Sequence, residues 1–485
     1  MSTTIANFIG GAERPADAGE TFEKLSPATG ELRAHVARSR EADVRAAVAA
    51  AKRAQVGWGA RPVTERGEAL RRIAQLMERD VEELAAIVAG ETGKSPSEAA
   101  GETKGAIEQA YFMAGEGRRF FGRTTTSAVP HRNASIVRQP VGVAGLIIAA
   151  NTPIANVAWK AFPALICGNG AVLKASEDAP ETALAVARLA AEAGLPAGVL
   201  NVVHGFGDEA GQPLVEHPDV GVVSFTGSTA VGRTIARVAG ERLAKVCLEL
   251  GGKNPLVVCD DADLERAADA AALSAWSNAG QRCAAGSRLI VFDAVYDRFL
   301  ELMRRRGDAQ RVGPGDEHDF GPVINKRGLD RMLEAVRRAM EQGARVAVGG
   351  QRLTGPEHAG GFYMAPTLVE GAELSSDIAH TELFGPVATL HRVADFEEAL
   401  AAANASSYGL TAAIWTASVH RAHEFATRVR SGLASVNGPT YGSEPHMPFG
   451  GVGDSGNGLR EPGPEALDVY SDLKTIYMNH DPARA

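Results

Sequence analysis

Apolar and polar positions along the chain alternate in a way that predicts helices separated by short buried strands. Residues 42–58 and 63–89 are rich in alanine and carry charges at helical spacing, which predicts two long amphipathic helices. Short apolar runs predict strands at 143–150, 171–174, 198–203 and 220–225, with helices at 182–193 and 230–239. The first half of the chain is therefore expected to form an α/β unit.

A second series of the same kind begins near residue 255. It comprises predicted strands at 256–259, 288–292, 387–392 and 412–415 and predicted helices at 264–278, 294–306, 327–342 and 396–403. Strand–helix alternation with compact connections is typical of a parallel sheet covered on both faces, and ligands of such sheets bind at the carboxyl ends of the strands. Two α/β units therefore meet near Gly251 and Gly252. The polar segment 122–139 interrupts the first unit, and 473–478 is predicted to be a short strand.

Composition and charge argue against several classes of function, namely those that involve nucleic acid or a membrane. The 485 residues are 45% hydrophobic and 22% charged, as expected for a folded protein of two or three domains. A formal net charge of -9, dispersed along the chain, excludes a general basic field for nucleic acid. The first residues lack a secretory pattern, and the longest apolar run, 141–150, is about half of a membrane span. We therefore expect a cytoplasmic protein with no membrane or nucleic-acid partner.

The cysteines separate into two kinds. None of the four belongs to a CxxC pair or has zinc-ligand spacing, so no disulfide framework and no metal site is expected. Cys167, Cys247 and Cys259 lie in apolar runs, where a cysteine is usually a small buried hydrophobe. Cys283 instead follows a predicted helix, lies between two glycines and has Arg282 beside it. Positive charge near a thiol favours the thiolate, so Cys283 is a candidate nucleophile.

Two glycine-rich loops each follow a predicted strand. Residues 203–207 form the first, and residues 225–232 form the second, which also opens a helix. Backbone N–H groups at a helix N-terminus attract phosphate, and glycine allows close approach of a ligand. Neither loop is a true GxGxxG, and a tight turn would explain either one alone.

Taken together, six ordered segments resemble the aldehyde dehydrogenase superfamily, and the resemblance covers essentially the whole chain. The segments are Ala-Asn-Thr-Pro at 150–153, Leu-Lys-Ala-Ser-Glu at 173–177, Phe-Thr-Gly-Ser at 225–228, Leu-Glu-Leu-Gly-Gly-Lys at 248–253, Gly-Gln-Arg-Cys at 280–283 and Glu-Leu-Phe-Gly-Pro at 382–386. The resemblance implies an α/β fold and a homodimer or homotetramer. The implied parts are a Rossmann-type cofactor domain (1–121 and 140–251), an α/β catalytic domain (252–465) and a small β oligomerisation element (122–139 and 466–485).

The same resemblance implies oxidation of an aldehyde to a carboxylic acid. The Cys283 thiolate would attack the carbonyl carbon, and hydride transfer to NAD(P)⁺ would leave a thioester. The Asn151 side-chain amide and the Cys283 backbone N–H would stabilise the oxyanion, and Glu249 would be the general base for water. Relatives that pass the acyl group to coenzyme A typically lack this glutamate, so its presence favours hydrolysis.

The cofactor residues follow from the same segments. They are Ile147, Lys174, Ser176, Glu177, Gly207, Gly227, Ser228, Leu250, Glu382 and Phe384. In the family, the position of Glu177 faces the adenine ribose, where a carboxylate holds the hydroxyls and repels a 2′-phosphate. NAD is therefore preferred, although Lys174 nearby softens the repulsion and leaves NADP open.

The predicted substrate pocket is more polar than that of relatives acting on simple aliphatic aldehydes. Its residues are Thr152, Asn156, Trp159, Ser277, Arg282 and Phe449. Thr152 and Ser277 stand where those relatives carry phenylalanine, which favours semialdehyde or oxygenated aldehyde substrates. Succinate-semialdehyde relatives often have arginine at the position of Trp159, which argues against that substrate.

The C-terminal motif departs from the family pattern. In residues 448–461, Gly453 replaces the usual lysine, and Leu459 either replaces the usual arginine or is an insertion. With an insertion, Glu461 would match the glutamate that relays protons in many relatives.

Three other functions are considered: a coenzyme A-acylating dehydrogenase, a non-catalytic binding or structural member of the fold, and a cysteine hydrolase. The last is disfavoured because no histidine stands near the Cys283 segment.

Overall fold

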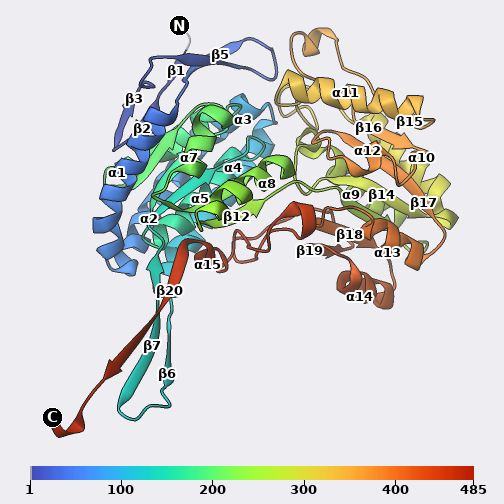
Figure 1. The fold of residues 1–485 in the computed structure, drawn as a ribbon. Coiled ribbons are helices and arrows are strands. Elements are labelled where there is room, and N and C mark those ends of the chain that lie inside the picture. Colours follow the sequence, from blue (N-terminus) through green and yellow to red (C-terminus); the bar gives the residue numbers. More distant parts are fainter. Residues whose placement is uncertain (1–2, 485) are drawn as a thin grey trace.

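Two seven-stranded sheets form the centres of the two halves of the molecule (Figure 1). The computed structural model describes residues 3–484, so residues 1, 2 and 485, which the predicted domains include, lie outside the described residues. The first sheet has the order β12 (Lys245–Glu249), β11 (Val220–Thr226), β8 (Val143–Ile147), β9 (Gly170–Lys174), β10 (Leu200–Val203), β2 (Asn7–Ile9) and β3 (Ala12–Arg14). Its first five strands are parallel, whereas β2 and β3 pair antiparallel.

The second sheet repeats this architecture. Its order is β15 (Arg345–Val348), β16 (Thr367–Glu370), β17 (Val387–Val393), β14 (Gly286–Phe292), β13 (Asn254–Val258), β18 (Thr411–Trp415) and β19 (Leu433–Val436). All pairs are parallel except that between β15 and β16. The α/β fold class expected from the sequence is confirmed.

Two smaller, three-stranded sheets contain the other strands of the described chain. One contains β1 (Thr3–Ile5), β5 (Leu32–Ala37) and β4 (Thr21–Leu25), and the other contains β20 (Ser471–Asn479), β7 (Arg132–Pro140) and β6 (Arg123–Thr126). The second forms an arm that projects from the body, with the C-terminus at its tip (Figure 1). The strand predicted at 473–478 lies within β20, which pairs antiparallel with β7 along its whole length.

Helices cover the faces of both large sheets. In the first half they are α1 (Glu41–Ala60), α2 (Val63–Arg79), α3 (Val81–Thr92), α4 (Pro96–Gly115), α5 (Pro153–Ile166), α6 (Pro180–Glu192), α7 (Gln212–Glu216) and α8 (Thr229–Glu241). In the second half they are α9 (Leu264–Trp276), α10 (Asp293–Ala309), α11 (Lys326–Glu341), α12 (Asp377–His380), α13 (Phe396–Asn404), α14 (Val419–Arg428) and α15 (Ala466–Tyr470). Of these, α15 packs back onto the first half through Leu467 and Tyr470.

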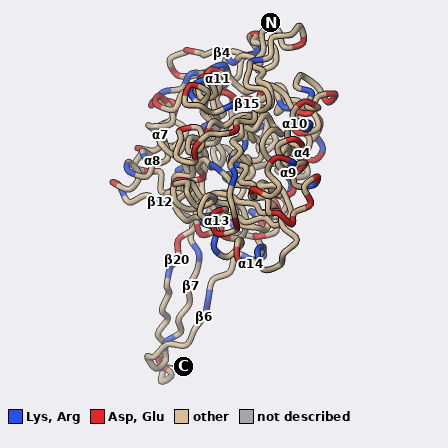
Figure 2. Tube along the Cα trace, turned by 90° about the vertical axis from the view of Figure 1, so that its right-hand side faces the viewer, with Lys and Arg blue, Asp and Glu red and all other residues tan. Residues whose placement is uncertain are grey.

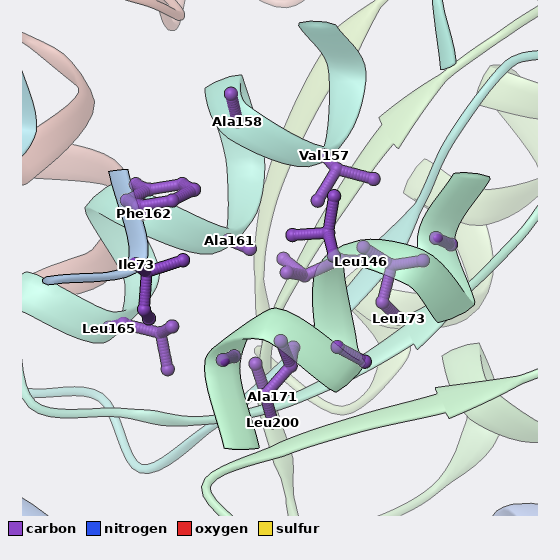
Figure 3. Packing of buried hydrophobic residues seen from close by; sticks show 14 of the residues in the cluster. Ile73, Leu146, Val157, Ala158, Ala161, Phe162, Leu165, Ala171, Leu173 and Leu200 are labelled. Carbon is purple, nitrogen blue, oxygen red and sulfur yellow. The ribbon is translucent and has the colours of Figure 1, made fainter. Parts of the chain in front are cut away.

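One core of the first half lies between its sheet and α5, and another lies on the opposite face of the sheet against α1 and α8. Figure 3 shows Val157 of α5 beside Leu146 and Leu173 of the sheet, and Leu165 near Ile73 of α2. Burying a side chain of this size contributes roughly 1.5–3 kcal/mol to the stability of the folded state. This apolar packing fixes α5 on the sheet, and with it the segment that leads into the helix.

The structure corrects two predicted helices. The single helix expected at 63–89 is two helices, because Asp80 leaves helical geometry with φ -103° and ψ 23°. Aspartate competes with the backbone for hydrogen bonds, and acidic residues in the next turn favour a new N-terminus there. The helix expected at 264–278 ends at Trp276, where the chain turns sharply.

Charges are interspersed over the body (Figure 2). Of the helices within residues 3–484, none has the length and apolar character needed to cross a membrane.

Candidate active site

A cavity of about 430 Å³ lies between the two halves of the molecule. The predicted residues that line it are Asn151, Thr152, Trp159, Arg282, Cys283 and Phe449. Asn151 comes from the end of the β8–α5 connection and Cys283 from the loop between α9 and β14. The fold therefore brings the predicted oxyanion donor and the predicted nucleophile to one cavity.

The loop before Cys283 is held in an unusual backbone conformation. Asn278, Ala279 and Gly280 have φ of 53°, 51° and 64°, in the left-handed region that non-glycine residues rarely adopt. A side chain at Gly280 would collide with the Gly385 carbonyl. The Asn278 N–H donates to Glu98 Oε1 at 2.7 Å, which ties the loop to α4. These constraints fix the direction of the chain into Cys283.

The environment of the Cys283 thiol differs from the sequence prediction. Burial raises the pKa of the thiol to about 12, and the carboxylates of Glu249 and Glu382 act in the same direction. The Arg282 guanidinium lies over the Tyr441 ring at 4.6 Å and 3.7 Å from Glu98, and it lowers the pKa only slightly. Arg282 therefore acts in the direction expected from the sequence, but the burial of the thiol outweighs its charge.

Glu249 is the last residue of β12, and its carboxyl group is shielded from water. It is buried, and within residues 3–484 neither carboxylate oxygen has a hydrogen-bond partner. Burial, together with repulsion from Glu461, raises the pKa of Glu249 well above its ordinary value. Gly450 passes so close to Oε1 that any side chain there would collide. A carboxyl group with a raised pKa holds a proton more tightly and is a stronger base when ionised, as a general base requires.

Glu461 is fully buried in a network of polar side chains. Lys160 Nζ donates to Glu461 Oε2 and to Ser224 Oγ, each at 2.7 Å. Ser224 Oγ donates to Glu461 Oε1 at 2.9 Å, and Tyr470 Oη donates to the same oxygen at 2.5 Å. Glu461 is therefore paired and fully hydrogen-bonded, and its charge acts on Glu249 across the site.

The backbone of Asn151 is held by a lysine in the segment between α3 and α4. Lys94 Nζ donates to the Asn151 carbonyl at 2.8 Å and pairs with Glu102 at 2.5 Å. The other oxygen of Glu102 accepts the N–H groups of Ile154 and Ala155 at 3.1 and 3.3 Å, in the first turn of α5. The buried Lys94–Glu102 pair therefore fixes both the backbone of Asn151 and the start of the helix that follows.

The predicted cofactor residues gather at one edge of the first sheet. Ile147 and Lys174 end β8 and β9, Ser176 and Glu177 follow β9, Gly207 follows β10, Gly227 and Ser228 lie between β11 and α8, and Leu250 follows β12. Glu382 and Phe384 come from the second half, before β17, and Glu382 Oε1 accepts the Gly252 N–H at 3.0 Å. Residues far apart in the sequence therefore meet around a single edge.

This edge fits a dinucleotide. Ser228 caps α8, whose N-terminus can attract phosphate. Lys174 Nζ lies 3.3 Å from Glu177, and although burial would raise the pKa of Glu177, Lys174 helps hold that pKa below its ordinary value. An ionised Glu177 suits ribose hydroxyls. A side chain at Gly251 would collide with the Glu382 carboxylate, so the two segments can approach closely only with glycine there.

Two residues predicted for the substrate pocket form local hydrogen bonds within the chain instead of lining the cavity. The Asn156 amide donates to the Thr152 carbonyl and hydroxyl, both at 2.9 Å, so it supports Thr152 from behind. Ser277 Oγ donates to the Leu273 carbonyl at 2.6 Å, at the end of α9. Alignment with the family motifs could not give the directions of these side chains, because it carries no information on side-chain contacts.

Sequence reasoning missed one wall of the cavity and part of the buried network. Polar residues of α4 and of the segment before it form this wall, namely Lys94, Glu98, Glu102 and Gln109. Two signals were available: polar residues at helical spacing in 98–109, and a single lysine, Lys160, within the apolar helix 153–166.

A nucleotide-type sheet edge, a cysteine on a constrained loop at the cavity and a desolvated carboxylate whose charge acts on that cysteine are features of a dinucleotide-dependent oxidoreductase. The sequence profile of the aldehyde dehydrogenase family matches residues 14–476, and the chain belongs to that family.

Individual relatives are similar over nearly their whole length. The α-ketoglutaric semialdehyde dehydrogenase of Bacillus subtilis (strain 168) is 38% identical over 98% of both chains. The α-ketoglutarate semialdehyde dehydrogenase of Haloferax volcanii is 39% identical over 99% of this chain and 100% of its own. The crystal structure of betaine aldehyde dehydrogenase from Staphylococcus aureus in complex with NAD⁺ is 32% identical, with a TM-score of 0.96, over 98% of this chain and 95% of that one.

Proposed function

We propose that the protein oxidises a polar aldehyde, of the semialdehyde or another oxygenated class, to a free carboxylic acid with NAD(P)⁺ through a thioester on Cys283. The observation that carries the proposal is the meeting of Cys283 and Asn151 in one cavity, close enough to Glu249 for that carboxylate to raise the pKa of the thiol. In this proposal Cys283 is the nucleophile, Asn151 is the oxyanion donor and Glu249 is the base.

Each of these residues has a separate role in the proposed reaction. Deprotonated Cys283 attacks the carbonyl carbon, and the Asn151 amide and the Cys283 N–H stabilise the oxyanion. The bound dinucleotide supplies the hydride acceptor. Glu249 then removes a proton from the water that attacks the thioester, which releases the acid and restores the thiol. Glu461, with Lys160 and Ser224, is proposed to carry the proton onward.

For the cofactor, we infer a preference for NAD over NADP. Glu177 at the end of β9 supports this preference, because its ionised carboxylate would repel a 2′-phosphate. The Staphylococcus aureus relative holds NAD⁺. Lys174 is 3.3 Å away, so NADP remains a weaker alternative.

For the substrate, the relatives named for α-ketoglutaric semialdehyde make that compound the first to test. Arg282 supports a carboxylated aldehyde, since it lines the cavity beside Cys283 and its Nε has no hydrogen-bond partner in the described part of the chain. We also propose that the subunits form a dimer or tetramer and that the protein is cytoplasmic.

The proposal is tested by separating the two half-reactions with Glu249→Gln. Because hydride transfer precedes hydrolysis, this variant should show a near-stoichiometric burst of NADH followed by slow turnover. Loss of the base should slow the second phase by roughly 10²–10⁴-fold. Rapid mixing measures the burst, and mass spectrometry detects the acyl-enzyme on Cys283.

An undiminished steady rate in Glu249→Gln would rule out Glu249 as the base. A burst of acyl-CoA when coenzyme A is added to the wild type, without free acid in its absence, would favour the acylating alternative. Lack of NADH formation with every aldehyde would instead favour a non-catalytic member of the fold.

A further inference from the structure

Tyr470 is a buried tyrosine whose hydroxyl meets a charged group. It is the last residue of α15, it is fully buried, and it belongs to the apolar core of the first half. Its hydroxyl donates to Glu461 Oε1 at 2.5 Å. Phenylalanine would fill the same space, so packing alone does not account for the hydroxyl, whereas the bond to Glu461 does. A hydrogen bond to a carboxylate is stronger than one between neutral groups.

One oxygen of Glu461 depends on the Tyr470 hydroxyl as a donor. Lys160 Nζ donates to the other oxygen, Oε2, at 2.7 Å. Ser224 Oγ lies 2.9 Å from Oε1 and 3.1 Å from Oε2, but its single hydrogen serves only one of them at a time. Burial, together with the charge of Glu461, raises the pKa of the Tyr470 hydroxyl well above its ordinary value. The hydroxyl therefore keeps its proton at neutral pH and remains a donor.

The charge of Glu461 reaches the proposed base. After burial, this charge is the next largest cause of the raised pKa of Glu249, and it acts in the same direction on the Cys247 thiol, two residues earlier in β12. The other charges that act on Glu249 are those of Lys160 and Arg460, which lower its pKa. A residue that holds Glu461 in place therefore acts on the base without touching it.

The helix that carries Tyr470 also joins the buried network to the arm. In Figure 1, α15 lies where β20 leaves the body, and β20 begins at Ser471, the next residue. Arg138 of β7 donates to Ser471 Oγ at 2.9 Å and pairs with Asp468 of α15 at 2.7 Å. Lys245, the first residue of β12, donates to the Ser471 carbonyl at 2.7 Å. The junction is therefore held from the arm and from the strand that ends in the proposed base.

We propose that Tyr470 is a positioning residue, which fixes the Glu461 carboxylate and couples it to the arm of β6, β7 and β20. The proposal rests on the proposed function, because it takes Glu249 as the base. Tyr470 is not among the residues that line the cavity, so it acts through Glu461 and not on the substrate.

The first test uses Tyr470→Phe, which keeps the ring and removes the hydroxyl. Glu461 loses a donor, so its charge is less firmly held and acts less on Glu249. The midpoint of the acid limb of kcat, measured with propanal and NAD⁺, should move to lower pH by about half a unit. Tyr363→Phe is the matched control, because Tyr363 is also fully buried but its hydroxyl has no partner in residues 3–484. That variant should keep the midpoint of the wild type.

A purely structural role would give a different result. If Tyr470 only fills the core, Tyr470→Phe should lower kcat or the melting temperature and leave the midpoint in place. An unmoved midpoint, or a move to higher pH, would overturn the positioning role.

The second test concerns the link to the arm. Arg138→Met loosens the junction without touching Glu461, and it should move the midpoint in the same direction as Tyr470→Phe. The double variant should move no further than Tyr470→Phe alone, because both changes act through one hydrogen bond. Arg132→Met, at the other end of β7, is the control, since Arg132 bonds Asn479 far from the junction. No shift in Arg138→Met, or additive shifts in the double variant, would overturn the coupling.

Glu249→Gln separates this proposal from the proposed function. An undiminished steady rate in that variant would refute the base itself. A burst of NADH followed by slow turnover in Glu249→Gln, together with an unmoved midpoint in Tyr470→Phe, would refute the role of Tyr470 alone.

Discussion

At the residue scale, Glu249 and Glu461 are two buried carboxyl groups whose charges act on each other. Lys160 bonds Glu461 directly, and it partly offsets the effect of Glu461 on Glu249. Burial is the largest cause of the raised pKa of Glu249, followed by Glu461, whereas Lys160 and Arg460 lower that pKa. The proton affinity of the proposed base is therefore adjusted by residues that do not touch the substrate.

This arrangement predicts opposite pH shifts in two variants. A general base must be ionised, so activity should rise as pH rises through the pKa of Glu249. Glu461→Gln removes a like charge, which lowers that pKa and should move the midpoint of the acid limb of kcat to lower pH by about one unit. Lys160→Met removes an opposite charge and should move the midpoint to higher pH. Shifts in the same direction, or none, in the two pH profiles would contradict the assignment.

Glu177 carries a separate prediction about the cofactor. Glu177→Gln removes the charge that opposes a 2′-phosphate while keeping the size of the side chain. The ratio of kcat/KM for NADP over NAD should rise about tenfold, which corresponds to about 1.4 kcal/mol. Glu192→Gln, an exposed site at the end of α6, is the control. If the ratio stays constant, another residue reads the ribose.

At the scale of elements, a buried ion pair between Lys94, just before α4, and Glu102 of α4 stands against the start of α5. Lys94 and Glu102 have side chains that are 3% and 7% exposed, and Glu102 also accepts the N–H groups that open α5. Removing one partner of such a pair leaves an uncompensated buried charge, which costs far more than removing both.

Glu102→Ala should therefore lower the free energy of unfolding by about 3–5 kcal/mol. The double variant Lys94→Met with Glu102→Leu should lose much less, because neither charge remains. Urea denaturation at fixed protein concentration measures both. Equal losses in the two variants would mean that the pair contributes through shape alone, and that the N-terminus of α5 does not depend on its charge.

At the scale of the whole molecule, the arm of β6, β7 and β20 projects from the body with apolar residues exposed. Leu473, Tyr477 and Met478 are 59%, 59% and 62% exposed on β20. Large exposed apolar residues clustered on one strand mark an interaction surface, and an uncovered strand edge is available for pairing.

Leu473→Asp should weaken the self-association expected of this protein, and sedimentation velocity should show smaller species at micromolar concentration. The charge would have to be buried wherever the arm packs on another subunit. Leu243→Asp is a matched control, since Leu243 is 92% exposed after α8, on the body rather than the arm. An unchanged sedimentation coefficient in Leu473→Asp would exclude this strand from the interface.

The sequence by itself determined the α/β class, the two successive units and the cofactor edge. Each of these depends on local patterns: apolar runs become buried strands, and loops such as 225–232 follow the strands they serve. In parallel sheets those loops meet at one edge whatever the details of packing, and it is the family resemblance that assigns Lys174, Gly227 and Leu250 at that edge to the cofactor.

Only the tertiary structure decided the directions of side chains and their exposure to water. Ser277 and Asn156 are hydrogen-bonded to the backbone of their own helices and do not line the cavity, while Glu98 and Gln109, which carry no motif, do. The adjacent charge of Arg282 predicted a thiolate at Cys283, yet burial by residues distant in sequence raises the pKa of that thiol to about 12. The physical reason is that desolvation and side-chain direction are set by contacts between elements, and sequence spacing records neither.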